Sequence, residues 1–180
     1  IIKEKIYTLF MKIIFFTEVY LPTINGVVTS INSFTGELVR RGHEVYIFTP
    51  SNPLAKKDPA NVFRVPASSL AVNKDYFWSH PDKNTFGLLK SLKPDIIHTH
   101  HQFNMGWFAL KSAKTLKIPL IDTYHTLLPD YVHHVPFFGK IEPFKSLLIG
   151  LLNDKTIKFS QQVDVLISPS HALASWLKKI

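Results

Sequence analysis

The sequence predicts an α/β fold in which a Rossmann-like, mostly parallel sheet carries helices on both faces. Short apolar segments alternate along the chain with segments of helical periodicity, as in folds built on a parallel sheet. The first apolar segment is continuous rather than alternating, which is typical of a strand buried on both faces. Residues 12–49 contain a strand, a loop, a helix and a second strand, in the order and size of a right-handed βαβ unit.

That first unit opens with the apolar run KIIFFT at residues 12–17, which predicts a buried strand. A loop follows at residues 18–26, where a proline and an Asn-Gly pair interrupt regular structure. Apolar residues then recur at steps of four, three and four on one face of a helix: Val27, Ile31, Phe34 and Leu38. Gly42 ends this helix, and residues 43–49 form the second strand.

The alternation continues to the end of the chain. Further strands are expected at residues 62–65, 95–99, 118–123 and 164–167, and helices at residues 85–92, 105–116, 141–160 and 170–179. Ser170 is the expected N-cap of the last helix. Residues 51–61 and 66–83 are predicted loops because they contain Pro, Asn and Ser. Residues 1–10 precede Met11 as an extension or an artefact, and residues 11–180 form one domain.

Composition limits the classes of function. Lys and Arg number 21 against 13 Asp and Glu, so the net charge of +8 suggests an anionic partner such as nucleic acid, an acidic membrane or a phosphorylated ligand. A soluble basic domain without such a partner has the same composition. The absence of cysteine excludes disulfides and thiolate metal sites and is compatible with the cytoplasm. No apolar run approaches the roughly 20 residues needed to span a bilayer, and the first ten residues lack a signal-peptide cleavage pattern.

Ligands of open α/β sheets bind outside the carboxyl ends of the strands, which nominates the loops at residues 18–26, 99–104, 123–134 and 168–170. The pair Asn25-Gly26 stands at a helix start, where bare backbone N–H groups and the helix dipole favour an anionic group. A glycine that only forms a turn and binds no ligand would give the same sequence pattern. The chain lacks both the dinucleotide glycine fingerprint and the P-loop.

Histidines gather in two of these loops. His98 and His100 of the segment HTHH lie on one face of a strand, next to His101. Without HExxH, a cysteine or a carboxylate at ligand spacing, we expect no metal there but a polar strand end near a ligand. His125 follows a buried strand, where it could hydrogen-bond a sugar or phosphate, transfer a proton, or only cap the sheet end.

Residues 133–158 mix apolar side chains with lysines, so they could seat a helix on an anionic bilayer. An ordinary amphipathic helix packed on the sheet is the other interpretation. Phe137 and Phe138 favour the membrane, because adjacent aromatic residues in a turn are costly to leave in water. With Lys140 and Lys145 they are the expected membrane contacts.

Five segments, taken in order, resemble the N-terminal domain of family 4 retaining glycosyltransferases, which have the GT-B fold. They are MKIIFFTEVYLPTINGVVTS at 11–30, RRGHEVYIFTP at 40–50, PDIIHTHHQFNMG at 94–106, DTYHT at 122–126 and ISPS at 167–170. The resemblance covers residues 11–180. The segment EVYLPTINGVVTS at 18–30 is most similar to the branch that glucosylates diacylglycerol to make membrane glycolipids.

The resemblance implies a set of site residues. His125 matches the active-site histidine of the family, which contacts the donor sugar. Asn25 and Gly26 would lie near the donor phosphates. The same cleft would be lined by Glu18, His100, Thr126 and Ser170. The resemblance further implies no bound metal or cofactor, a UDP- or GDP-activated sugar as co-substrate, and retention of anomeric configuration.

The leading hypothesis is therefore the acceptor-side half of an enzyme that moves a hexose from a nucleoside diphosphate sugar to a lipid or sugar hydroxyl. Family members carry a second Rossmann domain that binds most of the nucleotide, so we expect this domain to need its own C-terminal domain and to be inactive alone. We expect it in the cytoplasm, peripherally on the inner face of the cell membrane. The alternative is a non-catalytic Rossmann-like module that binds phosphate ligands or nucleic acid, although the scattered Lys and Arg residues argue against nucleic acid.

Overall fold

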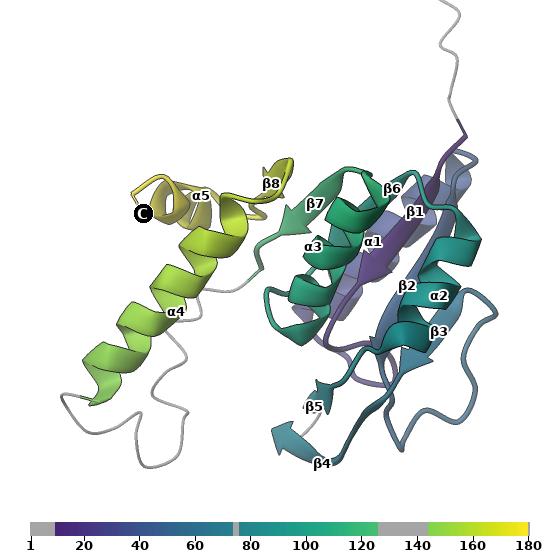
Figure 1. Ribbon diagram of the computed structural model, residues 1–180, viewed down its shortest axis with the longest axis horizontal. Helices are drawn as coiled ribbons and strands as arrows, with labels where there is room; N and C mark the ends of the chain where they lie inside the picture. The colour runs from purple at the N-terminus through teal and green to yellow at the C-terminus, as the bar shows by residue number, and fades with distance from the viewer. Residues whose placement is uncertain (1–9, 74–75, 126–143, 180) are drawn as a thin grey trace, which may run out of the picture.

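The computed structural model describes residues 10–73, 76–125 and 144–179, and it is built around a parallel sheet of six strands (Figure 1). The strands occur in the spatial order β3-β2-β1-β6-β7-β8. Every neighbouring pair is parallel. Their bounds are β1 Lys12–Phe16, β2 Glu44–Pro50, β3 Val62–Val65, β6 Ile96–Thr99, β7 Leu120–Thr123 and β8 Val165–Ile167. The predicted fold class is confirmed.

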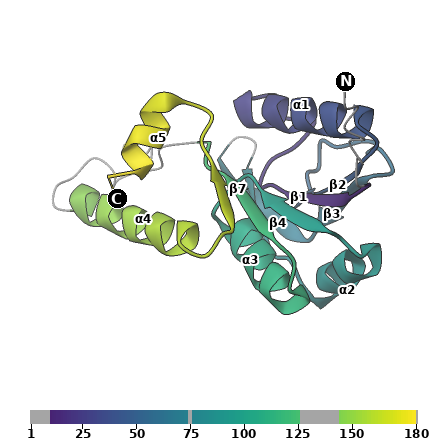
Figure 2. The ribbon, with the colours of Figure 1, turned by 90° about the horizontal axis from the view of Figure 1, so that it is seen from above.

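Helices cover both faces of the sheet (Figure 2). Helix α1 (Gly26–Arg40) packs on one face, and α2 (Lys83–Leu92) and α3 (Asn104–Leu116) pack on the other. Helices α4 (Phe144–Ser160) and α5 (His171–Leu177) lie beyond β7, at the β8 edge of the sheet (Figures 1 and 2). Among the described residues, no helix is both long enough and apolar enough to cross a membrane.

Strand β1 divides the hydrophobic core into two layers, because successive side chains of a strand point to opposite faces. Ile13 and Phe15 pack with Val28 and Ile31 of α1. Ile14 and Phe16 belong to the opposite layer, which includes residues of α2 and α3 such as Leu89, Met105, Ala109 and Leu110. The continuous apolar run of the sequence is thus explained by a strand that is buried on both sides.

Helix boundaries follow from their capping residues. The Asn25 side chain accepts a hydrogen bond from the backbone N–H of Val28 at the start of α1. Asp82 and Thr85 form a capping box, so α2 begins at Lys83, two residues before the predicted start. Past the end of α1, Gly42 has φ of 90°, the left-handed conformation that glycine adopts without a steric penalty.

The prediction of a loop at residues 66–83 was wrong. It contains β4 (Ala67–Asn73) and β5 (Tyr76–Ser79), which pair antiparallel as a separate two-stranded sheet. The Ser, Asn and Pro residues of this segment are typical of loops, and the ladder has register shifts that break simple alternation. Its strand character therefore comes from pairing with a neighbour, which local sequence does not show.

Gly106 is fixed by a close backbone approach. A Cβ atom added at this position in α3 would lie 2.1 Å from the carbonyl oxygen of His101. A Cβ at Gly36, an exposed position inside α1, would have no atom within 4 Å. The tight turn that joins β6 to α3 therefore depends on a glycine at position 106.

Replacing Gly106 with Ala should lower the free energy of unfolding by about 1–3 kcal/mol, because the backbone of the His101 turn must move to admit the methyl group. The matched variant Gly36→Ala should be neutral or stabilise the protein by about 0.5–1 kcal/mol, since alanine restricts the unfolded chain and favours the helix. Urea denaturation measures both. Equal stability of the two variants would contradict the close approach at Gly106.

Candidate functional site

The candidate site lies at the carboxyl edge of the parallel sheet, where the loops after β1, β6 and β7 meet. Backbone hydrogen bonds continue the ladder one step past the strands. The N–H of His100 donates to the carbonyl of Phe16 at 2.9 Å, and the N–H of Tyr124 donates to the carbonyl of Ile167 at 3.0 Å. Because α1 starts at Gly26 after β1, its N-terminus and His125 share this edge, as the sequence predicted.

A hydrogen-bonded pair of histidines forms the centre of the site. Nδ1 of His100 lies 2.9 Å from Nε2 of His125. The His100 ring is 1% exposed and stacks on the ring of His98, with centroids 4.3 Å apart. The ring of Phe15 packs edge-on against His98 and His100. The ring of Phe34, which comes from α1, also contacts both histidines. The prediction that His98 and His100 share one face is confirmed.

Burial keeps the histidines of this edge neutral. It lowers the pKa of His98 and of His101 to about 3, and the pKa of His125 to about 4. It lowers the pKa of His100 well below its usual value, with a smaller contribution from the neighbouring histidines. At neutral pH the site therefore offers polar, uncharged imidazoles rather than imidazolium ions.

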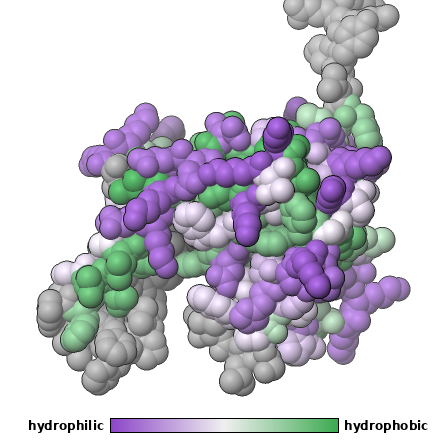
Figure 3. Space-filling model, in the orientation of Figure 1, coloured by the Kyte–Doolittle hydropathy of each residue, from purple (hydrophilic) through white to green (hydrophobic). Residues whose placement is uncertain are grey.

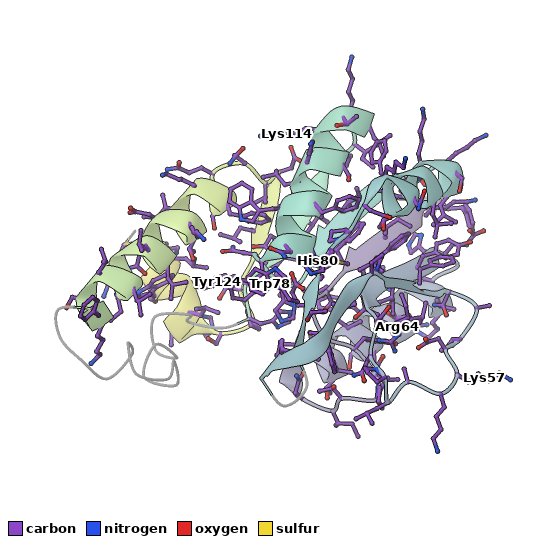
Figure 4. The ribbon with its side chains drawn as sticks, turned by 60° about the horizontal axis from the view of Figure 1, so that its bottom comes forward. Lys57, Arg64, Trp78, His80, Lys114 and Tyr124 are labelled. Carbon is purple, nitrogen blue, oxygen red and sulfur yellow. The ribbon has the colours of Figure 1, made fainter. Side chains whose placement is uncertain are left out.

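A hollow opens next to the histidine pair. It is lined by His100, His101, Gln102, Phe103, Thr123, Tyr124 and His125. These residues come from the end of β7 and from the loops after β6 and β7, so the hollow lies at the carboxyl edge of the sheet. Tyr124 lies where the sheet meets α5, and its ring stacks on Trp176 at 5.9 Å (Figure 4).

The start of α1 is open at Gly26. A Cβ added there would meet no atom within 4 Å, and the φ of Gly26 is not positive. Neither packing nor backbone conformation within the chain therefore demands a glycine at this position. The Asn25 side chain takes the N–H of Val28, which leaves the N–H groups of Gly26 and Val27 as those that an anionic group would meet, and the predicted role of Asn25 and Gly26 near the donor phosphates remains a prediction.

Glu18 has a partner that the sequence did not reveal. Its side chain is 7% exposed, and Oε1 accepts a hydrogen bond of 2.7 Å from the backbone N–H of Met105. Oε2 accepts one of 2.8 Å from the hydroxyl of Ser79. Burial raises the pKa of Glu18. Since α3 has no side-chain cap of its own, Glu18 caps that helix from a distance in sequence, and its predicted cleft-lining role remains a prediction.

The remaining predicted site residues are only partly described. Ser170 caps α5 as predicted, because its hydroxyl accepts a hydrogen bond from the N–H of Leu173. Lys145 lies on α4 and is half-buried. The other predicted residues, Thr126, Phe137, Phe138 and Lys140, lie outside the described residues. The cleft and membrane roles of this whole group therefore remain predictions.

Two buried polar residues of this edge were missed in the sequence. Asp122 is fully buried and accepts a 2.7 Å hydrogen bond from the side-chain amide of Gln102. Burial raises the pKa of Asp122 to about 7. Its position inside a short apolar strand, between Ile121 and Thr123, was the signal in the sequence that could have identified it.

Over the described part of the chain, no group of three or more His, Asp or Glu side chains is arranged to hold a metal ion.

Comparison with known proteins points to one family. The model of the family described as Glycosyltransferase Family 4 matches residues 24–180. The chain is 34% identical over 171 residues to an alpha-monoglucosyldiacylglycerol synthase of Streptococcus pneumoniae, covering 93% of this chain and 37% of that protein. It is 37% identical over 139 residues to the synthase of the same name from Acholeplasma laidlawii, covering 69% and 32%. The chain thus spans about a third of the length of these relatives.

More distant relatives and solved structures agree. A GDP-mannose-dependent alpha-mannosyltransferase of Mycolicibacterium smegmatis is 27% identical over 122 residues, which is 64% of this chain and 32% of that protein. The solved sucrose-phosphate synthase of Thermosynechococcus elongatus matches 93% of this chain and 45% of its own, with a TM-score of 0.62 at 14% identity. At that identity the structural likeness shows the fold alone.

Acid should destabilise the domain. Between about pH 4 and pH 6.5 the unfolded chain protonates His98, His100, His101 and His125, whereas the folded chain keeps them neutral. The free energy of unfolding therefore falls as the pH is lowered through this range. The raised pKa values of Asp122 and Glu18 act in the opposite direction, because the folded state holds protons that the unfolded state releases. The histidines outnumber these two carboxyl groups, so the melting temperature should drop from about pH 7.5 to about pH 5.

Thermal denaturation across this pH range measures the effect. His125→Gln should make the pH dependence shallower, because one neutral buried histidine is removed. His171→Gln, at an exposed position on α5, is the control for the loss of a histidine. A melting temperature that rises as the pH falls from 7.5 to 5 would contradict the neutral histidine cluster.

Proposed function

Since the chain belongs to glycosyltransferase family 4, we propose that it is the acceptor-side domain of a retaining enzyme that transfers a hexose from a nucleoside diphosphate sugar to a lipid hydroxyl. Because the chain spans about a third of the length of its relatives, we expect transfer to require this domain together with a nucleotide-binding C-terminal domain. No metal or cofactor enters the proposal. The donor base, uracil or guanine, stays open.

One observation carries this proposal: the histidine pair and the open start of α1 lie on the same edge of one sheet. The pair offers a neutral imidazole, and at the helix start the N–H groups of Gly26 and Val27 precede that of Val28, which the Asn25 side chain caps. A nucleotide sugar has a matching division into an uncharged, hydroxyl-rich hexose and an anionic diphosphate. We assign His125 to the hexose and the segment Asn25-Gly26 to the diphosphate.

The proposed chemistry replaces the bond between the anomeric carbon and the diphosphate oxygen with a bond to the acceptor oxygen, and the proton of the acceptor hydroxyl passes to the leaving diphosphate. Negative charge develops on the leaving diphosphate, where the positive end of α1 stabilises it. His125 holds the hexose in position through a hydrogen bond. Its pKa of about 4 means that it carries no extra proton at neutral pH, so it acts as a neutral hydrogen-bonding group rather than as a general acid.

A diacylglycerol-type lipid is the acceptor that we propose, because two relatives with more than 30% identity are named alpha-monoglucosyldiacylglycerol synthases. A sugar hydroxyl is the less specific alternative. The non-catalytic module that binds phosphate ligands or nucleic acid is not favoured, since the family match covers residues 24–180.

In an enzyme that contains both domains, His125→Ala should lower kcat by about a hundredfold, because a group that positions the reacting sugar is removed. The measurement is transfer of radiolabelled hexose from UDP- or GDP-sugars to diacylglycerol in mixed micelles. His43→Ala is the matched control, since His43 stands just before β2 at the opposite, amino edge of the sheet. Transfer at the wild-type rate by His125→Ala would remove this residue from the mechanism.

We also propose that α4 docks on an anionic membrane, on the cytoplasmic side. Phe144, Leu147 and Leu151 recur at steps of three and four residues, so they share one face of the helix, and all three are exposed. Figure 3 displays apolar residues along the part of α4 that projects from the domain. Lys155 and Lys158 continue the same exposed face toward its C-terminal end. Apolar side chains bordered by lysines suit the interface of an anionic bilayer.

Leu147→Ser should lower the partition coefficient for vesicles rich in phosphatidylglycerol by about fivefold, because one apolar side chain no longer enters the bilayer interface. Leu54→Ser is the matched control, since Leu54 is 68% exposed against 61% for Leu147 but lies in the loop after β2. Co-sedimentation with vesicles measures both variants. Equal binding of the two would contradict docking through α4.

A further inference from the structure

We infer that His100 fixes the tautomer of His125, so that His125 presents an Nδ1–H group to the cleft. His100 is thereby a positioning residue, which acts on the substrate through His125. The catalytic consequence rests on the proposed function, but the tautomer itself does not.

The first step of the argument is the proton on His100. Its Nδ1 faces Nε2 of His125 at 2.9 Å, whereas its own Nε2 is buried and has no hydrogen-bond partner among the described residues. A neutral imidazole carries one N–H group. A buried N–H without an acceptor is rarer in proteins than a buried acceptor without a donor. The proton of His100 therefore lies on Nδ1, where it has an acceptor.

Packing holds the His100 ring in the orientation that this bond needs. One of its faces stacks on His98, the ring plane of which is inclined by 24°. The edge of Phe15 approaches to a centroid distance of 5.0 Å, and Phe34 approaches to 6.3 Å. Only 1% of the surface of His100 is exposed, so its ring is removed from bulk solvent. These contacts favour a neutral, fixed imidazole.

The second step is the proton on His125. If Nδ1 of His100 donates, Nε2 of His125 accepts, and the single proton of neutral His125 must lie on its Nδ1. The two ring nitrogens point in divergent directions, so Nδ1 does not share the contact with His100. His125 lines the hollow at this edge of the sheet. It therefore offers a donor to an oxygen atom of a ligand there, and its acceptor nitrogen is occupied.

His101, in the same loop as His100, has the opposite arrangement. Its Nδ1 accepts a hydrogen bond of 3.2 Å from the backbone N–H of Glu18, a group that can only donate. The proton of His101 must then lie on Nε2. This neighbouring histidine, for which we expect the Nε2–H tautomer, is an internal reference for the measurement that follows.

The test is two-dimensional NMR of the chain with ¹⁵N-labelled histidine, in which long-range couplings identify the protonated nitrogen of each ring. We expect Nδ1–H for His100 and His125 and Nε2–H for His101, with signals assigned by single substitutions. An Nε2–H tautomer of His125 in the unaltered protein would overturn the inference, whatever the variants do.

Two variants of His100 separate the hydrogen bond from packing. His100→Leu fills much of the space but has no donor, so His125 should shift to Nε2–H, the tautomer that neutral histidine prefers in water. His100→Asn places an amide N–H close to the former Nδ1 position and should retain the Nδ1–H tautomer of His125. Retention of Nδ1–H in both variants would also overturn the inference.

Transfer assays of the enzyme with both domains connect the tautomer with function. His100→Leu should lower kcat roughly tenfold, and His100→Asn should restore most of the loss. In a His125→Ala background, His100→Leu should cause no further loss, because the effect passes through His125. If the NMR tautomers are as expected but His125→Ala transfers at the wild-type rate, the inference about His100 stands and the proposed role of His125 fails.

Discussion

Parallel pairing of β1 with β6, and of β6 with β7, is the constraint on which the rest of the structure depends. Hydrogen bonds of this ladder extend past the strands, so the backbone of His100 is bound to the carbonyl of Phe16. Because all three strands run in one direction, the residues that follow them arrive at one edge. The histidine pair and the start of α1 therefore face the same space, although 99 positions separate Gly26 from His125.

The polar residues at this edge are held by contacts between distant parts of the chain. Glu18 joins the loop after β1 to the first turn of α3 and to Ser79 of β5. Arg64 forms a paired ion bridge with Asp58, and it also donates hydrogen bonds to the carbonyls of Leu21 and Pro50 (Figure 4). Leu21 lies in the loop after β1, and Pro50 is the last residue of β2. A buried carboxylate and a partly buried guanidinium group, each with several partners, hold the rim in a defined shape.

The histidines combine burial with hydrogen bonding in a way that suits a neutral ligand. Burial among Phe15, Phe34 and neighbouring rings disfavours charge, and stacking fixes the orientation of each ring. An uncharged donor in such a place can bind a sugar hydroxyl without attracting a phosphate in its stead. In the function that we propose, the anionic part of a nucleotide sugar lies at the helix start near Gly26. The two groups are separated because Gly26 begins the helix after β1, whereas His125 follows β7.

The sequence by itself determined the α/β class, the six strands of the main sheet, the cap at Ser170 and the common edge of Gly26 and His125. Periodicity and capping residues are local signals, and the rule for ligand sites in parallel sheets depends only on the order of strands and helices. Tertiary structure alone decided that residues 67–73 and 76–79 pair as a separate antiparallel sheet and that Glu18 caps α3. It also decided that Nδ1 of His100 meets Nε2 of His125. Each of these features is a contact between side chains or strands whose partner is chosen by packing, and no pattern in neighbouring residues encodes the choice.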